Sequence, residues 1–321
     1  MKVLITGRLP EDVVNAVRLE HEVIINEQNT PMPRDQIVRH STDIDGLLPM
    51  VTDTIDDQLM GMAPRLRIIA NYGVGYDNID VAAATARGIW VTNTPDVLTD
   101  ATADVTLALI LAVARRVVEG DKRIRAGKFP KWAPMPFLGH DVTGKTLGII
   151  GLGRIGRAVA RRARGFDMPV LYHNRNRLPE AEERELSATY ADLKTLLSES
   201  DFVSLHVSFS SETRHLIARE ELKMMKQTAY LINASRGPVV DEHALVDALR
   251  AGIIAGAGLD VFEKEPELAP GLTELDNVVL VPHIGSATVE TRYKMAELAV
   301  KNLLAGLKGQ VPPNCLNSAL R

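Results

Sequence analysis

A glycine-rich loop, GIIGLGRIG at residues 148–156, constrains the fold of this chain more than any other stretch. Its glycines follow the G-x-G-x-x-G spacing, directly after an apolar β-type run and directly before a helical pattern. In that context the first glycine permits a tight turn, the second lets the backbone approach a pyrophosphate, and the third allows close packing of helix on strand. The helix N-terminus then offers unpaired N–H groups to the phosphates. The residues predicted to bind a dinucleotide here are Gly151, Gly153, Arg154, Ile155 and Gly156.

The strand predicted to follow, VLY, is not succeeded by the acidic residue that such folds place beside the adenosine ribose. His173, Asn174, Arg175 and Arg177 stand there instead. A carboxylate would accept hydrogen bonds from the ribose hydroxyls of NAD and repel a 2′-phosphate, whereas a guanidinium can bind that phosphate bidentately. We predict that NADP(H) is preferred and NAD(H) possible, with Arg175 or Arg177 on the phosphate and Asn174 on the ribose. The alternative is a solvated basic turn.

The composition is typical of a globular protein with more than one core. The chain has 321 residues, of which 45% are hydrophobic and 24% charged, and a net charge of −4. Its length favours two domains, and its mild acidity gives no reason to expect nucleic acid or a membrane surface as a partner. MKVLITGRLPEDVV predicts a strand and not a signal peptide. With Cys315 as the single cysteine, we expect no disulfide, no thiolate metal site, no bound metal, and a cytoplasmic location.

Short β-type runs alternate with helical patterns in both halves of the chain, which favours parallel sheets covered by helices. We predict an α/β fold with two doubly wound parallel-sheet domains. A Rossmann cofactor domain, 99–287, is inserted into a flavodoxin-like substrate domain. The substrate domain comprises 1–98 plus 288–321, because the closing helical stretch is expected to return to the first sheet, which has few helices of its own.

The segment between the two predicted sheets begins as a helix and continues as an irregular arm. Residues 99–127 predict one long helix that ends at Gly127. Residues 128–144 are rich in proline and contain Trp132. Proline-rich, partly apolar arms often lie on a neighbouring subunit, so we expect a homodimer.

Three residues that can perform acid–base or electrostatic chemistry follow predicted strands of the second domain. Arg236 follows AYLINAS, Glu265 follows GLDVFEK and His283 follows VVLVP. In doubly wound sheets, ligands bind outside the carboxyl ends of the strands. An arginine can hold a carboxylate, a histidine can protonate a carbonyl oxygen as hydride arrives, and a carboxylate can orient that histidine. Together with a nicotinamide that supplies the hydride, the three residue types would suffice for reducing a 2-keto acid, although each taken singly could instead support a turn or loop.

Five stretches, in this order, resemble the D-isomer-specific 2-hydroxyacid dehydrogenase family: NYGVGYDNID, GIIGLGRIG, LINASRGPVVDEHAL, AGLDVFEKEP and LVPHIGSAT. The resemblance covers the chain from its first strand to its last helix. It implies a discontinuous substrate domain, an inserted cofactor domain, and a homodimer with its active site in the cleft. The implied catalytic residues are Arg236, Glu265 and His283. The implied substrate-binding residues are Arg236 together with Val74 and Gly75, whose N–H groups would bind the substrate carboxylate. The implied cofactor wall contains Ala234, Ser235, Asp260, which would hold the nicotinamide amide, and Gly285.

Within the family, the arm and the closing stretch HIGSAT…NLLAGLKG look most like glyoxylate/hydroxypyruvate reductases. That branch often carries arginine after the second cofactor strand, and it uses an aromatic residue of the partner's arm, for which Trp132 or Phe137 could serve. The implied reaction is reduction of glyoxylate or hydroxypyruvate by NADPH, with His283 as general acid. The alternatives are a larger 2-keto acid, such as 2-ketogluconate, and a nucleotide-sensing binding module on the same fold. Leu48, Met50 and Tyr72 could be pocket walls or core residues.

Overall fold

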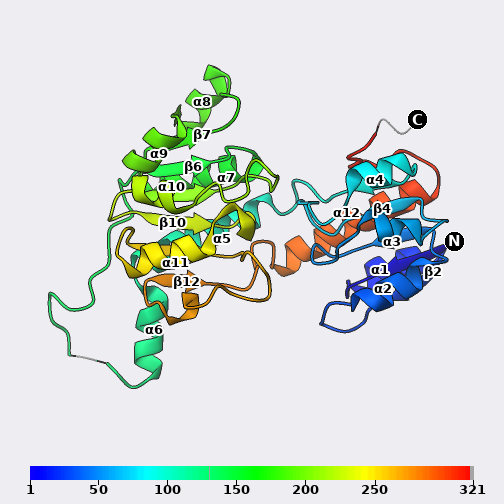
Figure 1. Cartoon of the computed structure of the whole chain (residues 1–321), viewed down its shortest axis with the longest axis horizontal. Coiled ribbons are helices and arrows are strands. Elements are labelled where there is room, and N and C mark those ends of the chain that lie inside the picture. The colour runs from blue at the N-terminus through cyan, green and yellow to red at the C-terminus, as the bar shows by residue number, and fades with distance from the viewer. Residues whose placement is uncertain (130, 319–321) are drawn as a thin grey trace. The chain divides into compact units, whose positions relative to one another are not determined.

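The computed structural model describes residues 1–129 and 131–318. The chain divides into two compact units, each shown in Figure 1. Unit 1 comprises Met1–Leu98 and Thr288–Arg321, and unit 2 comprises Thr99–Ala287. In the described part of the chain, no helix combines the length and the apolar character needed to cross a membrane.

Unit 1 contains a five-stranded sheet in the order β2-β1-β3-β4-β5, with every neighbouring pair parallel. Its strands are β1 (Lys2–Ile5), β2 (Glu22–Ile25), β3 (Gly46–Leu48), β4 (Ile68–Ala70) and β5 (Trp90–Thr92). Its helices are α1 (Glu11–Arg18), α2 (Arg34–Ser41), α3 (Asp57–Gly61), α4 (Val81–Ala86) and α12 (Val289–Leu307). This strand order is the flavodoxin-like one.

Helix α12 comes from the end of the chain and packs on β3, β4 and α1 of unit 1. Its N-cap Thr288 accepts a hydrogen bond from the N–H of Thr291, which satisfies one of the free amides of the first turn. Ala296, Ala299 and Leu303 are fully buried along its inner face. Their i, i+3, i+7 spacing is that of one helix face, which places the apolar side of α12 on the sheet.

Unit 2 contains a seven-stranded sheet in the order β12-β11-β10-β9-β6-β7-β8, again with every neighbouring pair parallel. Its strands are β6 (Leu147–Ile150), β7 (Val170–His173), β8 (Ala188–Tyr190), β9 (Phe202–Leu205), β10 (Tyr230–Asn233), β11 (Gly256–Leu259) and β12 (Val278–Leu280). Its α-helices are α5 (Thr99–Ala114), α6 (Val117–Arg125), α7 (Arg154–Ala163), α8 (Glu180–Leu186), α9 (Leu193–Glu199), α10 (Arg219–Met224) and α11 (Glu242–Arg250). Short 3-10 helices are η1 (Arg164–Phe166), η2 (Gly237–Val239) and η3 (Leu272–Glu274).

The sheet of unit 2 buries a hydrophobic cluster on each face. Along β10, Tyr230 and Ile232 belong to the cluster beneath α5 and α7, whereas Leu231 belongs to the cluster beneath α9, α10 and α11. Alternate residues of a strand point to opposite faces, so both faces need a covering layer. The strand order reverses between β6 and β9, which is the switch point of a Rossmann sheet. The prediction of two parallel-sheet α/β domains is confirmed.

Two details of the sequence-based prediction were wrong or incomplete. The helix predicted over 99–127 is broken into α5 and α6, because Arg116 adopts a left-handed backbone conformation with φ of 55°. The Arg116 side chain stabilises the break by binding Glu119 with two nitrogens, at 2.8 and 2.9 Å. Strand β8 was not predicted. It is only three residues long and follows a helix without a strong turn signal.

Candidate active site

The glycine loop between β6 and α7 has the geometry that a bound pyrophosphate requires. Gly151 has a φ of 97°, and a Cβ there would lie 2.7 Å from the carbonyl carbon of His206. At Gly156 a Cβ would lie 2.3 Å from the carbonyl oxygen of Gly151. At Gly153, by contrast, a Cβ would meet nothing within 4 Å, and no side chain caps the helix that starts there. The residues therefore fit a dinucleotide, whose phosphates the first-turn amides of α7 would bind.

In the turn after β7, Asn174 is tied to the glycine loop and Arg175 extends into solvent. The Asn174 Oδ1 accepts the Leu152 N–H at 2.7 Å, so the turn and the loop are fixed to each other. Arg175 has a side chain 88% exposed and forms an ion pair with the exposed Glu212 at 3.0 Å. Such surface pairs are weak, so Arg175 can exchange its partner for an anionic ligand at little cost.

Arg177 is held quite differently from Arg175. Its Nε and Nη2 each donate to one carboxylate oxygen of Glu183, at 2.8 Å, and Tyr172 donates its hydroxyl to the same carboxylate at 2.6 Å. The Glu183 side chain is 10% exposed. The hydrogen bonds from Arg177 and then Tyr172 hold the pKa of the Glu183 carboxyl at about 2. Of the two arginines predicted for a 2′-phosphate, Arg177 is committed to this carboxylate and braces the turn.

The histidine and the glutamate predicted at strand ends are in direct contact. His283 Nδ1 lies 2.9 Å from Glu265 Oε2, and Glu265 Oε1 accepts the Phe262 N–H at 3.0 Å. Burial alone would raise the pKa of Glu265, but the hydrogen bond and charge of His283, the Phe262 amide and the charge of Arg236 together hold that pKa below its ordinary value. The carboxylate is therefore ionised at neutral pH and fixes the ring, leaving Nε2 as the nitrogen that can face a substrate.

Asp260, one residue after β11, organises the turn that carries His283. It is 1% exposed, and its two carboxylate oxygens accept the N–H groups of Ile284 at 2.6 Å and Gly285 at 2.8 Å. Its carbonyl oxygen accepts the His283 N–H at 2.9 Å. Burial raises the pKa of the Asp260 carboxyl. These contacts hold His283 in a left-handed conformation with φ of 52°, which points its side chain toward Glu265.

Arg236 lies just after β10, and its backbone is fixed by the strand end. Asn233 donates its amide to the Arg236 carbonyl at 2.9 Å, while its Oδ1 accepts the N–H and the hydroxyl of Ser235 at 3.0 and 2.8 Å. Gly237 is required next, because a Cβ there would lie 1.9 Å from the Phe262 carbonyl. This close approach joins the Arg236 turn to the loop that carries Glu265. Ala234, also predicted for the cofactor wall, is buried.

In unit 1, the loop after β4 presents the two amides predicted to bind a carboxylate. The Val74 carbonyl accepts the Asn93 side-chain amide at 2.8 Å, and the Gly75 carbonyl accepts that of Asn71 at 2.7 Å. With both carbonyls fixed, neither N–H donates to an acceptor within the described residues. Both residues are partly exposed. The loop thus offers two adjacent, accessible N–H donors, as anion binding requires.

Of the three residues in unit 1 whose place was undecided, two belong to the core. Leu48 is fully buried, and Tyr72 is buried with its hydroxyl donating to the Arg292 carbonyl at 2.7 Å. Met50 is partly exposed.

His206, at the switch point, was missed by the sequence analysis. It follows β9, its carbonyl packs where a Gly151 side chain would lie, and its Nε2 lies 2.8 Å from the Ser204 hydroxyl. Its Nδ1 is shielded from solvent, although the residue as a whole is only partly buried. Burial lowers the pKa of His206 to about 4, so the ring beside the glycine loop is neutral. The signal that could have found His206 in the sequence is its position directly after β9, the strand that starts the second half of the Rossmann sheet.

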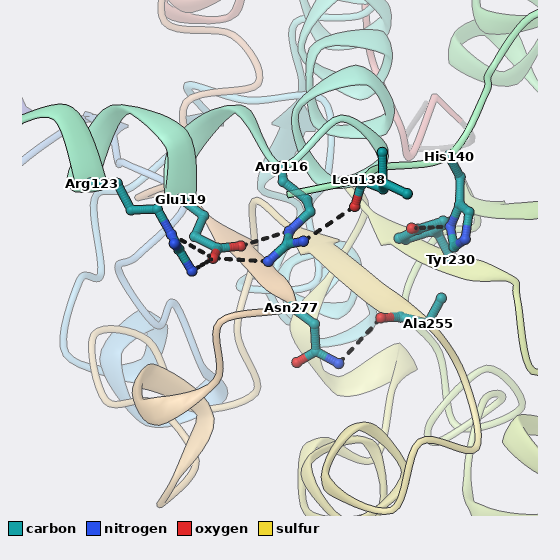
Figure 2. Close-up of polar contacts among 8 residues, drawn as sticks. All are labelled: Arg116, Glu119, Arg123, Leu138, His140, Tyr230, Ala255 and Asn277. Atoms are coloured by element: carbon teal, nitrogen blue, oxygen red, sulfur yellow. Dashed lines mark hydrogen bonds and ion pairs between the residues drawn. The ribbon is translucent and has the colours of Figure 1, made fainter. Parts of the chain in front are cut away.

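Figure 2 shows how the last part of the arm, at Leu138 and His140, is anchored to the rest of unit 2. Arg116 donates to the Leu138 carbonyl at 3.2 Å, and the His140 Nδ1 lies 2.6 Å from the Tyr230 hydroxyl. The Phe137 ring is covered by the guanidinium of Arg116, 4.3 Å from its centre, and by a second arginine of α6. Trp132 is 89% exposed. Of the two aromatic residues predicted to reach a partner, Phe137 is therefore bound within its own chain.

The strand orders and the glycine loop together define a dinucleotide-binding α/β protein. Residues 107–285 match the family described as "D-isomer specific 2-hydroxyacid dehydrogenase, NAD binding domain". The chain belongs to the D-isomer-specific 2-hydroxyacid dehydrogenase family, and it is a nicotinamide-dependent oxidoreductase acting on a 2-keto or 2-hydroxy acid.

Relatives and solved structures match the chain over nearly its whole length. A glyoxylate reductase of Thermococcus litoralis is 54% identical over 98% of this chain and 96% of its own. The crystal structure of the TT0316 protein of Thermus thermophilus is 48% identical, with a TM-score of 0.92 over 98% of this chain and 100% of that one. An NADPH-dependent glyoxylate/hydroxypyruvate reductase of Sinorhizobium meliloti, solved with NADP and malonate, is 35% identical, with a TM-score of 0.88 over 98% and 96%.

Proposed function

We propose that this protein reduces glyoxylate to glycolate, or hydroxypyruvate to D-glycerate, with NADPH as the preferred cofactor. The observation that carries the reaction is the His283–Glu265 contact at 2.9 Å, beside Arg236 at the ends of neighbouring strands. The relatives named glyoxylate reductase support the choice of a small 2-keto acid.

In this proposal each residue has a distinct role. The bound cofactor would supply a hydride to C2 of the keto acid. His283 would donate a proton from Nε2 to the carbonyl oxygen, so that the oxygen gains a proton as the carbon gains the hydride. Glu265 would hold the imidazolium that precedes this transfer, because its ionised carboxylate faces Nδ1. Arg236 would bind the substrate carboxylate or polarise its carbonyl.

The remaining binding roles rest on the local geometry of each loop. We assign the substrate carboxylate to the N–H groups of Val74 and Gly75, whose carbonyls are already bonded. We assign the nicotinamide amide to Asp260, each of whose carboxylate oxygens accepts one backbone N–H and has a further lone pair. The 2′-phosphate is assigned to Arg175, since Arg177 is bound by a buried carboxylate.

The cofactor proposal predicts the outcome of changing Arg175 to glutamine. Loss of one charge-assisted hydrogen bond to the 2′-phosphate should cost about 1.5–3 kcal/mol, which is about a 10- to 150-fold rise in KM for NADPH. The KM for NADH should stay nearly constant, because NADH has no 2′-phosphate. Initial rates with glyoxylate and hydroxypyruvate, measured with both cofactors for wild type and variant, provide the comparison.

A matched control is Arg184→Gln, which removes an exposed arginine of α8 that pairs across one helical turn with Glu180 at 3.4 Å. It should leave both KM values unchanged. If wild type has a higher kcat/KM with NADH than with NADPH, the arginine turn is merely solvated and the cofactor assignment is wrong. Turnover of 2-ketogluconate but of neither small acid would support the larger substrate, and cofactor binding without any turnover would support a nucleotide-sensing module.

We also propose that the protein is a homodimer whose interface is formed by α6 and the arm. Six large hydrophobic side chains in this part of the described chain are exposed. They are Val117, Ile124, Phe129, Trp132, Met135 and Leu138. Leu138 also lines a hollow of about 260 Å³, together with apolar residues such as Val279 and polar ones such as Glu119 and Asn277. A twofold interface places the same surface of each copy face to face, so the exposed apolar side chains of one copy would be buried against those of the other, and a second copy of this chain is the partner that fits.

Changing both Phe129 and Trp132 to serine is therefore expected to convert a dimer to a monomer, as measured by analytical ultracentrifugation. The two exposed rings would otherwise bury a large apolar area against the partner. Leu19→Ser is the control, since Leu19 is equally exposed but lies at the end of α1. A monomeric wild type, or a double variant that stays dimeric, would refute the interface.

A further inference from the structure

A buried glutamate outside the proposed catalytic set holds the loop that carries Glu265. Glu242, the first residue of α11, is 4% exposed. Its Oε1 accepts the Glu263 N–H at 2.5 Å, and its Oε2 accepts the Ala269 N–H at 3.2 Å. One carboxylate thus closes the two ends of the 263–269 segment, with Glu265 between them.

Because the Glu242 carboxyl is buried, its ionised form depends on the hydrogen bonds that it accepts. Burial raises the pKa of the Glu242 carboxyl, and the nearby charge of Glu263 acts in the same direction. The two amides oppose that shift, and the N-terminus of α11 also favours a negative charge. A buried carboxylate kept at such a position needs both donors, because losing either leaves an unsatisfied polar group.

The rest of the loop is fastened around the same point. The Glu263 side chain lies 2.8 Å from His215 Nε2, and Gly237 packs directly on the carbonyl of Phe262. Within the segment, the Glu267 N–H donates to the Lys264 carbonyl at 2.8 Å. The segment is therefore a closed turn, and its two attachment points on Glu242 fix where the Glu265 side chain emerges.

We propose that Glu242 is a positioning residue for the proton transfer: by binding the amides of Glu263 and Ala269 it sets the place of Glu265, and through Glu265 the orientation of His283. This inference rests on the proposed function. Glu242 joins Glu265 and Asp260 as a carboxylate that fixes the surroundings of His283, but Glu242 is proposed to touch neither substrate nor cofactor. An error of about 1 Å in the place of a catalytic group can lower a rate by about 100-fold, so the fixed position of this loop matters for turnover.

The test is Glu242→Gln, alone and combined with Glu265→Gln. A glutamine has the same size, but it can accept only one of the two N–H groups and turns its own NH₂ toward the other. We expect kcat with the preferred keto acid to fall about 10- to 100-fold. The dissociation constant for NADPH, measured by its fluorescence, should change less than about twofold, since the glycine loop is untouched. In the Glu265→Gln background, Glu242→Gln should have little further effect on kcat, because its action passes through Glu265.

Asp241→Ala is the matched control for lost stability. Asp241 caps the same helix by accepting the Ala244 N–H at 3.0 Å but bonds to neither end of the 263–269 segment. It should lower the melting temperature and leave kcat nearly unchanged. If Glu242→Gln does not fold, Glu242→Asp carries the test, since a shorter carboxylate can reach one amide but not both.

The outcomes separate this inference from the proposed function. Wild-type kcat in Glu242→Gln, together with a large loss in Glu265→Gln, would overturn the positioning role alone. An equal loss of kcat from Glu242→Gln in both backgrounds would also overturn it, because a general structural defect would then explain the effect. Full activity in Glu265→Gln would overturn the role of Glu265 and this inference with it.

Discussion

Replacing His283 by glutamine is expected to lower kcat by about 10²- to 10⁴-fold, the usual contribution of a general acid. Glutamine preserves a polar side chain that can still reach Glu265, but it cannot give up a proton at neutral pH. The contact of His283 Nδ1 with Glu265 at 2.9 Å should therefore be partly replaced while the chemistry is lost. Steady-state rates with glyoxylate and NADPH, and NADPH binding by fluorescence, would show a collapse of kcat with nearly unchanged affinity.

The control for this prediction is His243→Gln, an exposed histidine on α11. It should retain wild-type turnover. The assignment of His283 as the acid would be abandoned if its variant kept more than about a tenth of wild-type kcat, because that loss is smaller than general acid catalysis provides. Weakened NADPH binding in the His283 variant would point instead to a role in the cofactor wall.

The parts of this protein that could be predicted from sequence are those where local pattern and topology agree. GLGRIG follows an apolar run and opens a helix, so the sequence predicted both the glycine turn and the order of strand and helix. In the structure, two of its glycines have no room for a side chain. Arg236, Glu265 and His283 were found because parallel strands bring their carboxyl ends to one edge. The His283–Glu265 contact follows from that topology and not from their separation in the chain.

The parts that could not be predicted depend on which partner a charged side chain selects. Arg175 and Arg177 are two residues apart in one turn, yet Arg177 binds Glu183 and Arg175 extends into solvent. The sequence of the turn does not distinguish the two arginines, because the pairing of Arg177 with Glu183 also depends on Tyr172, whose hydroxyl donates to the Glu183 carboxylate. Similarly, Arg116, at the break before α6, donates to the carbonyl of Leu138, which lies 22 residues further along the chain. Long-range hydrogen bonds of this kind override a helical composition.

Replacing Arg236 by alanine is expected to lower kcat/KM for the keto acid by about 10²- to 10³-fold, the effect of removing one donor from a developing negative charge. The Arg236 backbone should stay in place, because its carbonyl is held by Asn233 and Gly237 packs on Phe262. The loss would therefore come from the guanidinium itself. Added guanidinium chloride at low concentration should restore part of the rate, since a small cation can occupy the space that the side chain leaves.

Arg219→Ala serves as the control, because Arg219 is an exposed residue of α10 paired with Asp247 at 3.0 Å. It should show wild-type rates and no response to guanidinium. Rescue of Arg236→Ala would mean that the charge and donors act directly on the reacting substrate. A loss without rescue that was accompanied by a lower melting temperature would mean that Arg236 serves chiefly to hold the strand end. Where rescue occurs, the rescued rate should be measured against keto acid concentration. Added guanidinium that lowers KM binds the substrate carboxylate, whereas guanidinium that raises kcat polarises the carbonyl.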